Sequence, residues 1–597
     1  MAFCYSGTGT DLQQQMYFQI LSRKINNNFY IIIVGTLDWV VIGIFFLALI
    51  GIIVWVVKQK QNDSADYFLG GRDATWLAIG ASIFASNIGS EHLIGLAGAG
   101  ASSGMAMAHW EIQGWMILIL GWVFVPFYSR SMVYTMPEFL ERRYNPQSRT
   151  ILSVISLISY VLTKVAVTVY AGGLVFQQVF GIKELWGIDF FWIAAIGLVV
   201  LTALYTIFGG MKSVLYTSVL QTPILLLGSL IILVLGFKEL GGWDEMMSIC
   251  SAVTVNEYGD TMTQLIRDNN DPNFPWLGAL VGSAIIGFWY WCTDQFIVQR
   301  VLSGKNEKEA RRGTIFGAYL KLLPVFLFLI PGMIAFALHQ KYIGAGGEGF
   351  LPLLANGTAN ADAAFPTLVA KLLPAGVKGL VVCGILAALM SSLASLFNSS
   401  AMLFTIDFYK RFKPETPEKK LVGIGQIATV VIVILGILWI PIMRSVGDVL
   451  YTYLQDVQSV LAPGIAAAFL LGICWKRTSA KGGMWGLIAG MIIGLTRLGA
   501  KVYYSNTAIT DSSMFKYLFY DLNWLFFCGW MFLFCIIVVI AVSLMTEAPS
   551  AEKIQGLVFG TSTPEQKAAT RASWNHWDII HTVIILAITA AFYWYFW

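Results

Sequence analysis

Fourteen stretches of 18 or more mainly apolar residues run along the chain. They cover residues 37–57, 75–100, 108–128, 150–178, 187–208, 213–236, 277–300, 314–338, 376–408, 421–442, 448–475, 482–500, 523–545 and 576–597. A helix needs about 20 such residues to cross a bilayer, whereas a membrane-spanning strand would show about ten residues of alternating polarity, a pattern that is absent here. The sequence therefore predicts an all-α polytopic membrane protein with about 14 transmembrane helices.

Composition narrows the class of protein further. Of the 597 residues, 57% are hydrophobic and 12% are charged, against about 45–50% and about 25% in ordinary soluble domains. The net charge of +4 is near balance and does not favour nucleic-acid binding. The five histidines show no pairing that would hold a catalytic metal. We therefore expect a lipid-embedded protein that neither binds nucleic acid nor acts as an enzyme.

The positive charges favour one orientation in the membrane. About 24 of the 38 Lys and Arg residues fall in the loops on one side of the predicted spans, and the positive-inside rule makes that side cytoplasmic. Both termini are then extracytoplasmic, and residues 1–36 form an extracytoplasmic N-terminal tail. The expected location is a cell membrane, either a bacterial inner membrane or a plasma membrane.

Two predicted spans carry glycine and polar residues in their middle. The second contains Ala81–His92, and the seventh contains Gly287–Gln295. The two spans are five apart, which inverts their topology, as in transporters built from inverted repeats whose discontinuous helices bind ions and substrate near the midplane. The alternative is a kink filled by neighbouring side chains. The predicted division of the chain is a peripheral first helix at 37–57, inverted repeats at 75–236 and 277–475, and peripheral C-terminal helices at 482–597.

Further polar side chains interrupt the apolar stretches. Glu111 and Gln113 begin the third span, Lys321 lies in the eighth and Gln455 lies in the eleventh. Because a charge inside a membrane costs about 2.5–3.5 kcal/mol, we expect such groups to share one site. Carboxylate, ammonium, imidazole and carboxamide groups suit the hydroxyls of a sugar, and the aromatic run 289–291 would form a wall against its ring.

Two other polar features each have a structural interpretation. Lys164, in the fourth span, is expected to extend its side chain to the membrane surface. The hydroxyl cluster Ser391, Ser392 and Ser395 in the ninth span could form an oxygen cage for a small cation. Small residues also allow close helix packing in membranes, so the pattern alone leaves both interpretations of this cluster open.

Five sequence motifs occur one after another along the chain. They are Ala85-Ser86-Asn87-Ile88-Gly89-Ser90 with His92, Thr135-Met136-Pro137-Glu138, Tyr205-Thr206-Ile207-Phe208-Gly209-Gly210-Met211, Trp289-Tyr290-Trp291-Cys292-Thr293-Asp294-Gln295, and Ser391-Ser392-Leu393-Ala394-Ser395-Leu396-Phe397-Asn398-Ser399. With them the chain resembles the sodium/glucose cotransporters of the solute:sodium symporter family, from residue 37 to 500. The resemblance implies LeuT-type inverted five-helix repeats with discontinuous first helices, and movement of Na⁺ and sugar together by alternating access.

The resemblance also implies two sets of site residues. The sodium ligands would be the carbonyls of Ala85, Ile88 and Ala388 and the hydroxyls of Ser391 and Ser392. The sugar contacts would be Asn87, His92, Glu111, Tyr290, Trp291, Lys321 and Gln455, with Tyr290 closing over the sugar as an inner gate. Family members that bind a second Na⁺ have an aspartate where Ser218 follows Tyr216-Thr217, so we expect one Na⁺ per sugar.

These features together predict a sodium-coupled symporter that imports a neutral sugar, a hexose such as glucose or galactose. Glu91 beside His92 resembles the inositol-transporting branch of the family, which keeps myo-inositol as an alternative. Two further alternatives are a symporter of another small solute and a sugar sensor that does not transport. The sequence leaves the oligomeric state open.

Overall fold

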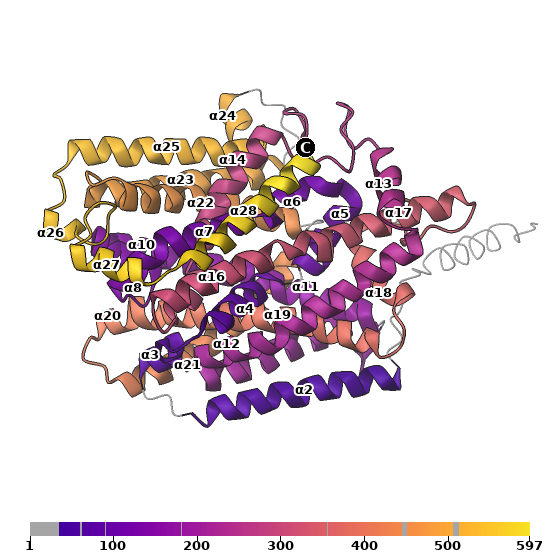
Figure 1. Ribbon diagram of the computed structural model, residues 1–597, viewed down its shortest axis with the longest axis horizontal. Coiled ribbons are helices and arrows are strands. Elements are labelled where there is room, and N and C mark those ends of the chain that lie inside the picture. Colours follow the sequence, from indigo (N-terminus) through magenta and orange to yellow (C-terminus); the bar gives the residue numbers. More distant parts are fainter. Residues whose placement is uncertain are drawn as a thin grey trace, which may run out of the picture.

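The molecule is a bundle of long helices, many of which run roughly parallel along the horizontal direction of Figure 1. The computed structural model describes residues 35–59, 63–89, 91–180, 182–354, 356–444, 450–505 and 513–597. Residues 1–34, which make up nearly all of the predicted N-terminal tail, lie outside the described residues.

The first part of the chain is helical apart from one short hairpin. Its elements are α2 (Thr36–Val57), α3 (Ser64–Leu69), η1 (Gly70–Arg72), α4 (Trp76–Asn87), η2 (Glu91–Leu96), α5 (Ala97–Ser103), η3 (Gly104–Met107), α6 (Ala108–Glu111), α7 (Gly114–Ile119), η4 (Leu120–Phe124), α8 (Val125–Ser131), α9 (Met136–Arg143), α10 (Pro146–Ser159), η5 (Tyr160–Val165), α11 (Ala166–Phe180), the antiparallel strands β1 (Glu184–Leu185) and β2 (Ile188–Asp189), α12 (Phe190–Leu240) and α13 (Trp243–Ser251).

The described residues of the remaining part form helices joined by loops. Its central elements are α14 (Trp276–Gly287), η6 (Phe288–Thr293), α15 (Gln295–Leu302), α16 (Glu307–Lys321), η7 (Val325–Leu329), α17 (Ile330–Gly344), η8 (Ala361–Ala363), α18 (Ala364–Leu372), α19 (Val377–Met402), η9 (Leu403–Tyr409) and α20 (Lys410–Phe412). The last elements are α21 (Glu418–Arg444), α22 (Leu450–Cys474), α23 (Ala480–Ser505), α24 (Met514–Lys516), η10 (Tyr517–Asp521), α25 (Trp524–Met545), α26 (Ala551–Ile554), α27 (Pro564–Ala572) and α28 (His576–Tyr595).

Among the described residues, eleven helices are long and apolar enough to cross a membrane, against fourteen predicted stretches. One reason for the difference is that α12 consists of two helices joined across a kink at Gly210, so the fifth and the sixth stretch count as one. Gly210 bends this helix with a left-handed φ of 53°, and a Cβ there would lie 2.5 Å from the carbonyl oxygen of Tyr67. A second reason is that α4, before the break in the second stretch, is too short to be counted as a span.

Both predicted helix breaks are present. The α4 helix ends at Asn87, where Ile88 takes an extended conformation (φ −81°, ψ 110°) before η2 begins. In the seventh stretch, Asp294 is extended (φ −77°, ψ 128°) between η6 and α15. Its carboxylate accepts a hydrogen bond from the Phe296 N–H at 3.2 Å and so caps α15. Each break leaves backbone groups without helical partners.

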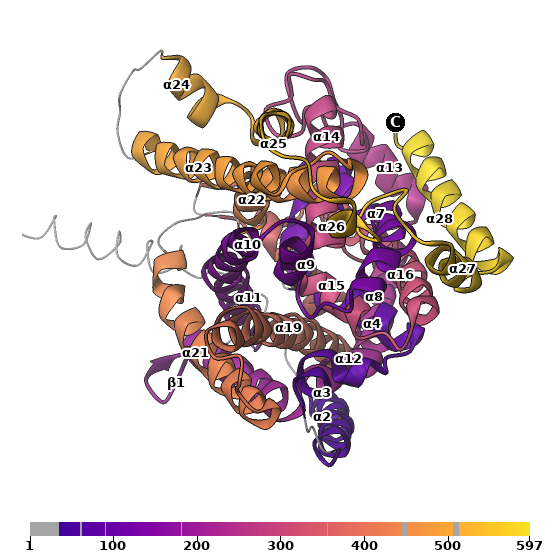
Figure 2. The same ribbon diagram turned by 90° about the vertical axis from the view of Figure 1, so that its left-hand side faces the viewer.

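Small residues bring the central helices together. A Cβ on Gly80 of α4 would lie 2.5 Å from the Phe316 ring of α16, and one on Gly313 would lie 2.6 Å from Ile79. The α19 helix is buried over almost its whole surface, including its serine residues. The end-on view of Figure 2 shows α19 and α15 near the centre and α2, α21, α25 and α28 at the outside.

Candidate functional site

One cavity lies between the two broken helices. The cavity volume is about 80 Å³, below the range of about 300–1,000 Å³ usual for small-molecule sites. All seven residues predicted as sugar contacts line it, namely Asn87, His92, Glu111, Tyr290, Trp291, Lys321 and Gln455. The structure thus gathers residues from six separate helices around one buried space.

A buried ion pair forms one side of the cavity. The ammonium of Lys321 lies 2.6 Å from a carboxylate oxygen of Glu111 and donates to the Asn87 carboxamide oxygen at 3.1 Å. Neither charged side chain is more than 4% exposed. A charge this deeply buried requires a partner, and pairing makes this side of the cavity polar but neutral.

His92 lies between two carboxylates. Its Nε2 is 3.4 Å from Glu111, and its Nδ1 is 3.8 Å from Glu91. The break after α4 produces this arrangement, because η2 starts at Glu91 and turns both side chains toward the cavity.

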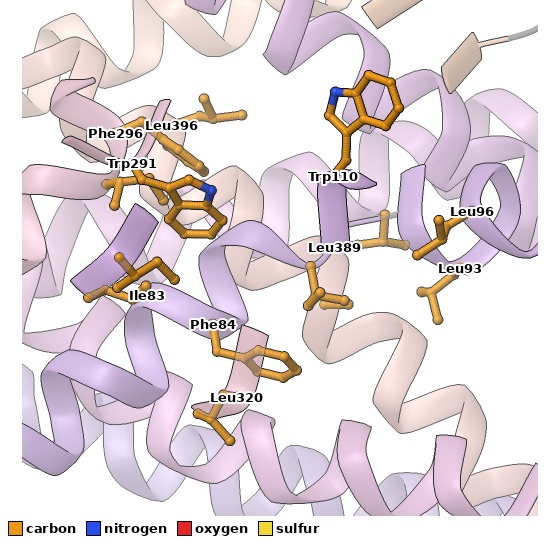
Figure 3. Packing of buried hydrophobic residues seen from close by; sticks show 14 of the residues in the cluster. Ile83, Phe84, Leu93, Leu96, Trp110, Trp291, Phe296, Leu320, Leu389 and Leu396 are labelled. Carbon is orange, nitrogen blue, oxygen red and sulfur yellow. The ribbon is translucent and has the colours of Figure 1, made fainter. Parts of the chain in front are cut away.

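Aromatic rings line the cavity next to the ion pair, with the Lys321 ammonium 5.3 Å from the Trp291 ring centroid. The Tyr290 hydroxyl accepts a hydrogen bond from the Asn87 carboxamide at 3.1 Å, and the Trp291 ring packs edge-on against Tyr290 with centroids 4.9 Å apart. Figure 3 shows Trp291 and Phe296 close together and Trp110 apart from them; all three line the cavity. Including Trp289 in the aromatic wall was wrong: it is absent from the lining and lies over the Lys164 ammonium, 5.2 Å from ring centroid to nitrogen.

The expectation for Lys164 was also wrong. Its side chain does not reach the surface of the molecule: it is 9% exposed, and its ammonium lies 2.5 Å from a carboxylate oxygen of Asp294. The Tyr160 hydroxyl also donates to Asp294. A carboxylate 130 residues further along the chain supplies the partner that a buried ammonium requires.

Other lining residues were not among the predicted contacts. They are Ser86, Glu91, Trp110, Gln113, Lys164, Thr168, Ile286, Gly287, Phe296, Leu396 and Gln458, and Ser392, a predicted sodium ligand, lines the cavity as well. Glu91, Gln113 and Lys164 carry a sequence signal, because each is polar within an apolar stretch. Trp110, Ile286, Phe296 and Leu396 carry none, because apolar residues are ordinary everywhere in such a chain.

The hydroxyl cluster of α19 meets the broken end of α4. The Ser392 hydroxyl lies 3.0 Å from the carbonyl oxygen of Ser86 and 3.1 Å from that of Ile88. Ala85 lies in the last turn of α4, whose carbonyls lack onward helical partners, and Ala388 lies one turn before Ser392. Oxygen atoms of this kind are the ligands that a hard cation prefers.

The Ser391 hydroxyl has a different partner from the Ser392 hydroxyl. It lies 3.3 Å from the Ser218 hydroxyl on α12, which in turn lies 3.4 Å from the Ser82 hydroxyl on α4. Consecutive residues of a continuous helix project about 100° apart, so Ser391 and Ser392 join α19 to two different neighbours.

Discontinuous helices that converge on a buried polar cavity define a secondary membrane transporter. The family model described as "Sodium:solute symporter family" matches residues 67–490. The chain belongs to this family, and it is a Na⁺-coupled symporter rather than an enzyme.

Curated relatives and a solved structure agree with this assignment. The chain is 37% identical over 538 residues to the sodium/myo-inositol cotransporter 2 of Homo sapiens, covering 88% of this chain and 79% of the relative. It is also 37% identical over 529 residues to the sodium/glucose cotransporter 1 of Ovis aries, covering 85% and 79%. The structure of a Na⁺-coupled sialic acid symporter superposes with a TM-score of 0.69 at 22% identity, covering 86% of this chain and 99% of that one. The predicted all-α, LeuT-type fold is thereby confirmed.

Proposed function

We propose that the protein imports a neutral, polyhydroxylated ring compound together with Na⁺, and that this solute is a hexose such as glucose or galactose. The observation that carries the proposal is the Glu111–Lys321 pair, 2.6 Å apart. It offers hydroxyl groups a strong acceptor and a strong donor but gives the cavity no excess charge that would favour an ionic solute.

A cyclitol is the second candidate. Glu91 adds an acceptor beside His92, and its Oε2 is buried without a hydrogen-bond partner among the described residues. The relatives include both a myo-inositol and a glucose cotransporter. A ring with a hydroxyl at every carbon would use the extra acceptor, which supports myo-inositol as the alternative solute.

The sodium site that we propose lies where α19 meets the end of α4. Carbonyls of Ala85, Ile88 and Ala388 with the hydroxyls of Ser391 and Ser392 would supply its oxygen ligands. Asn87, a cavity residue, lies in the same broken segment. An ion that ties α19 to α4 would therefore also fix Asn87 and favour solute binding, which is a positive coupling between the two sites.

One Na⁺ per solute is sufficient for accumulation. A charge that crosses about 100 mV contributes roughly 2.3 kcal/mol, and a tenfold Na⁺ gradient adds about 1.4 kcal/mol. Their sum, about 3.7 kcal/mol, corresponds to accumulation of several hundredfold. The hydroxyl of Ser218, rather than a carboxylate, beside Ser391 supports this stoichiometry.

Uptake of labelled glucose, galactose and myo-inositol into proteoliposomes tests the proposed function. We expect an inward Na⁺ gradient to drive uptake of at least one hexose, and an equal K⁺ gradient to drive none. Uptake of myo-inositol but of neither hexose would show that the transported solute is a cyclitol and not a hexose. Solute-induced quenching of tryptophan fluorescence without any uptake would instead indicate a sensor.

We further propose that both termini are extracytoplasmic, that 75–236 and 277–475 are the inverted repeats, and that 37–57 and 482–597 are peripheral. The orientation rests on the distribution of Lys and Arg and has a direct test. Cys474 is the exposed cysteine among the described residues and ends α22. A membrane-impermeant maleimide should label it in inside-out vesicles of a Cys4→Ser variant, and labelling in right-side-out vesicles would reverse the assignment.

A further inference from the structure

The third predicted span is broken at its first turns, which brings two polar side chains to the cavity. The α6 helix ends at Glu111 and α7 begins at Gly114, while Ile112 (φ −81°, ψ 23°) and Gln113 (φ −84°, ψ 23°) leave the helical conformation. Residues two apart in a continuous helix point about 200° from one another. Here Glu111 and Gln113 both line the same cavity.

Two contacts fix the orientation of the Gln113 carboxamide. Its Nε2 donates to the carbonyl oxygen of Ser283 at 2.9 Å, and its Oε1 accepts from the indole N–H of Trp291 at 3.3 Å. The residue is only 3% exposed. A carboxamide has two donor hydrogens and two acceptor lone pairs, so one of each is left for a ligand in the cavity.

Gly287 provides the space that Gln113 occupies. A Cβ at position 287 would lie 2.5 Å from Oε1 and 2.9 Å from the carboxamide carbon of Gln113, which is closer than van der Waals contact permits. The absence of a side chain at 287 therefore determines where the carboxamide lies. The Trp291 ring, held by the same Oε1, depends on it as well.

We propose that Gln113 is a specificity-determining residue of this transporter. Its carboxamide binds one hydroxyl of the solute with the donor and acceptor that Ser283 and Trp291 leave unused, and Gly287 keeps the carboxamide in place. The inference rests on the proposed function, because it requires a polyhydroxylated solute. The ligand class at this position is a hydroxyl-bearing ring that lies against Trp291.

The test compares analogues of the best-transported solute that each lack one hydroxyl. In the wild type, removal of the hydroxyl that meets Gln113 should raise the KM by about tenfold, the usual cost of losing one hydrogen bond in a desolvated site. In Gln113→Leu the parent solute should have that raised KM, and the same analogue should show no further increase. The Na⁺ concentration for half-maximal uptake should change less than twofold.

Two further variants separate recognition from structural support. Gly287→Ala, which keeps the carboxamide but displaces it, should reproduce the loss of discrimination at the same hydroxyl. Gln426→Leu is the control, because it removes a carboxamide outside the cavity lining that donates to the Ile207 carbonyl at 3.1 Å. This variant should leave the ratio of each analogue's KM to the KM of the parent solute unchanged.

Three results would overturn the inference. If Gln113→Leu or Gly287→Ala raises the KM of all analogues by one common factor, Gln113 only supports the structure. If Gln113→Leu fails to fold, Gly287→Ala carries the same comparison. Absence of Na⁺-driven uptake by the wild type would reject the proposed function and the inference with it. Normal wild-type uptake, with the same ratios of analogue KM to parent KM in both variants as in the wild type, would reject the inference alone.

Discussion

The ammonium of Lys164 on η5 lies 2.5 Å from the carboxylate of Asp294, the residue that separates η6 from α15. The same ammonium lies 4.8 Å from the Tyr290 ring centroid and 4.7 Å from that of Phe296. The pair thus joins the fourth span to the break in the seventh, directly beside the aromatic side of the cavity. A cation over aromatic faces gains further attraction when it is desolvated.

Removing either partner of this pair should destabilise the protein strongly. Lys164→Met leaves Asp294 as an uncompensated buried charge, which costs about 3–5 kcal/mol in comparable pairs. The double variant Lys164→Met/Asp294→Asn should recover much of that loss, since no unpaired charge is left. Thermal unfolding of the purified protein in detergent, followed by tryptophan fluorescence, would measure both effects.

The exposed pair between Lys516 and Asp521, 3.0 Å apart, is the matched control. Surface pairs contribute about 0–1 kcal/mol, so Lys516→Met should shift the unfolding temperature little. An equally small shift in Lys164→Met would contradict the buried-pair interpretation.

Ser392→Ala should weaken the dependence of uptake on Na⁺. The variant removes the hydroxyl that lies 3.0 Å and 3.1 Å from two carbonyls of the broken α4 end. Loss of one oxygen ligand should raise the Na⁺ concentration for half-maximal uptake by about tenfold or more. Uptake measured against Na⁺ concentration at saturating solute would show it.

Ser400→Ala offers a control on the same helix. Ser400 is buried in α19, and its hydroxyl has no hydrogen-bond partner in the described part of the chain. Its removal should leave the Na⁺ response unchanged. A Ser392→Ala variant with the Na⁺ response of Ser400→Ala would reject the proposed sodium site.

The sequence predicts those parts of the fold that depend on local pattern. Apolar stretches predict the helices, and the polar residues within 81–92 and 287–295 predict the two breaks, because glycine and polar side chains weaken a membrane helix locally. The kink at Gly210 follows the same pattern: it falls between the fifth and the sixth apolar stretch, and non-helical backbone there divides α12 into two helices.

Contacts between distant segments could not be predicted in the same way. Lys164 and Asp294 are 130 residues apart, so each alone looks like a charge that could reach the membrane surface. The position of Gln113 depends on a break at Ile112, and Gly114 beside it does not by itself show which side chains the break turns toward the cavity. The family resemblance indicated which distant residues belong to the sodium site and which to the sugar site, and the pattern of polar residues alone could not.

Gln455→Ala should weaken solute binding more than Na⁺ binding. The Gln455 side chain lines the cavity, and its Oε1 is buried without a hydrogen-bond partner among the described residues. An acceptor in that position gains a partner when a hydroxyl binds, so its loss should raise the KM for solute by about tenfold. The half-maximal Na⁺ concentration should rise less than twofold. Gln426→Ala is the matched control, and equal effects on solute and Na⁺ would place Gln455 outside the solute site.

Glu111→Gln should change the charge preference of the transporter. The substitution keeps the shape and one acceptor of the side chain but leaves the Lys321 ammonium without its carboxylate at 2.6 Å. The cavity then carries an excess positive charge in a desolvated site, where a complementary ligand charge is strongly favoured. Uptake of glucose should fall at least about tenfold, while the ratio of glucuronate to glucose uptake should rise. Lys321→Met leaves the negative charge of Glu111 unpaired and should lower the ratio of glucuronate to glucose uptake. If this ratio moves in the same direction in both variants, the pair does not determine the charge of the transported solute.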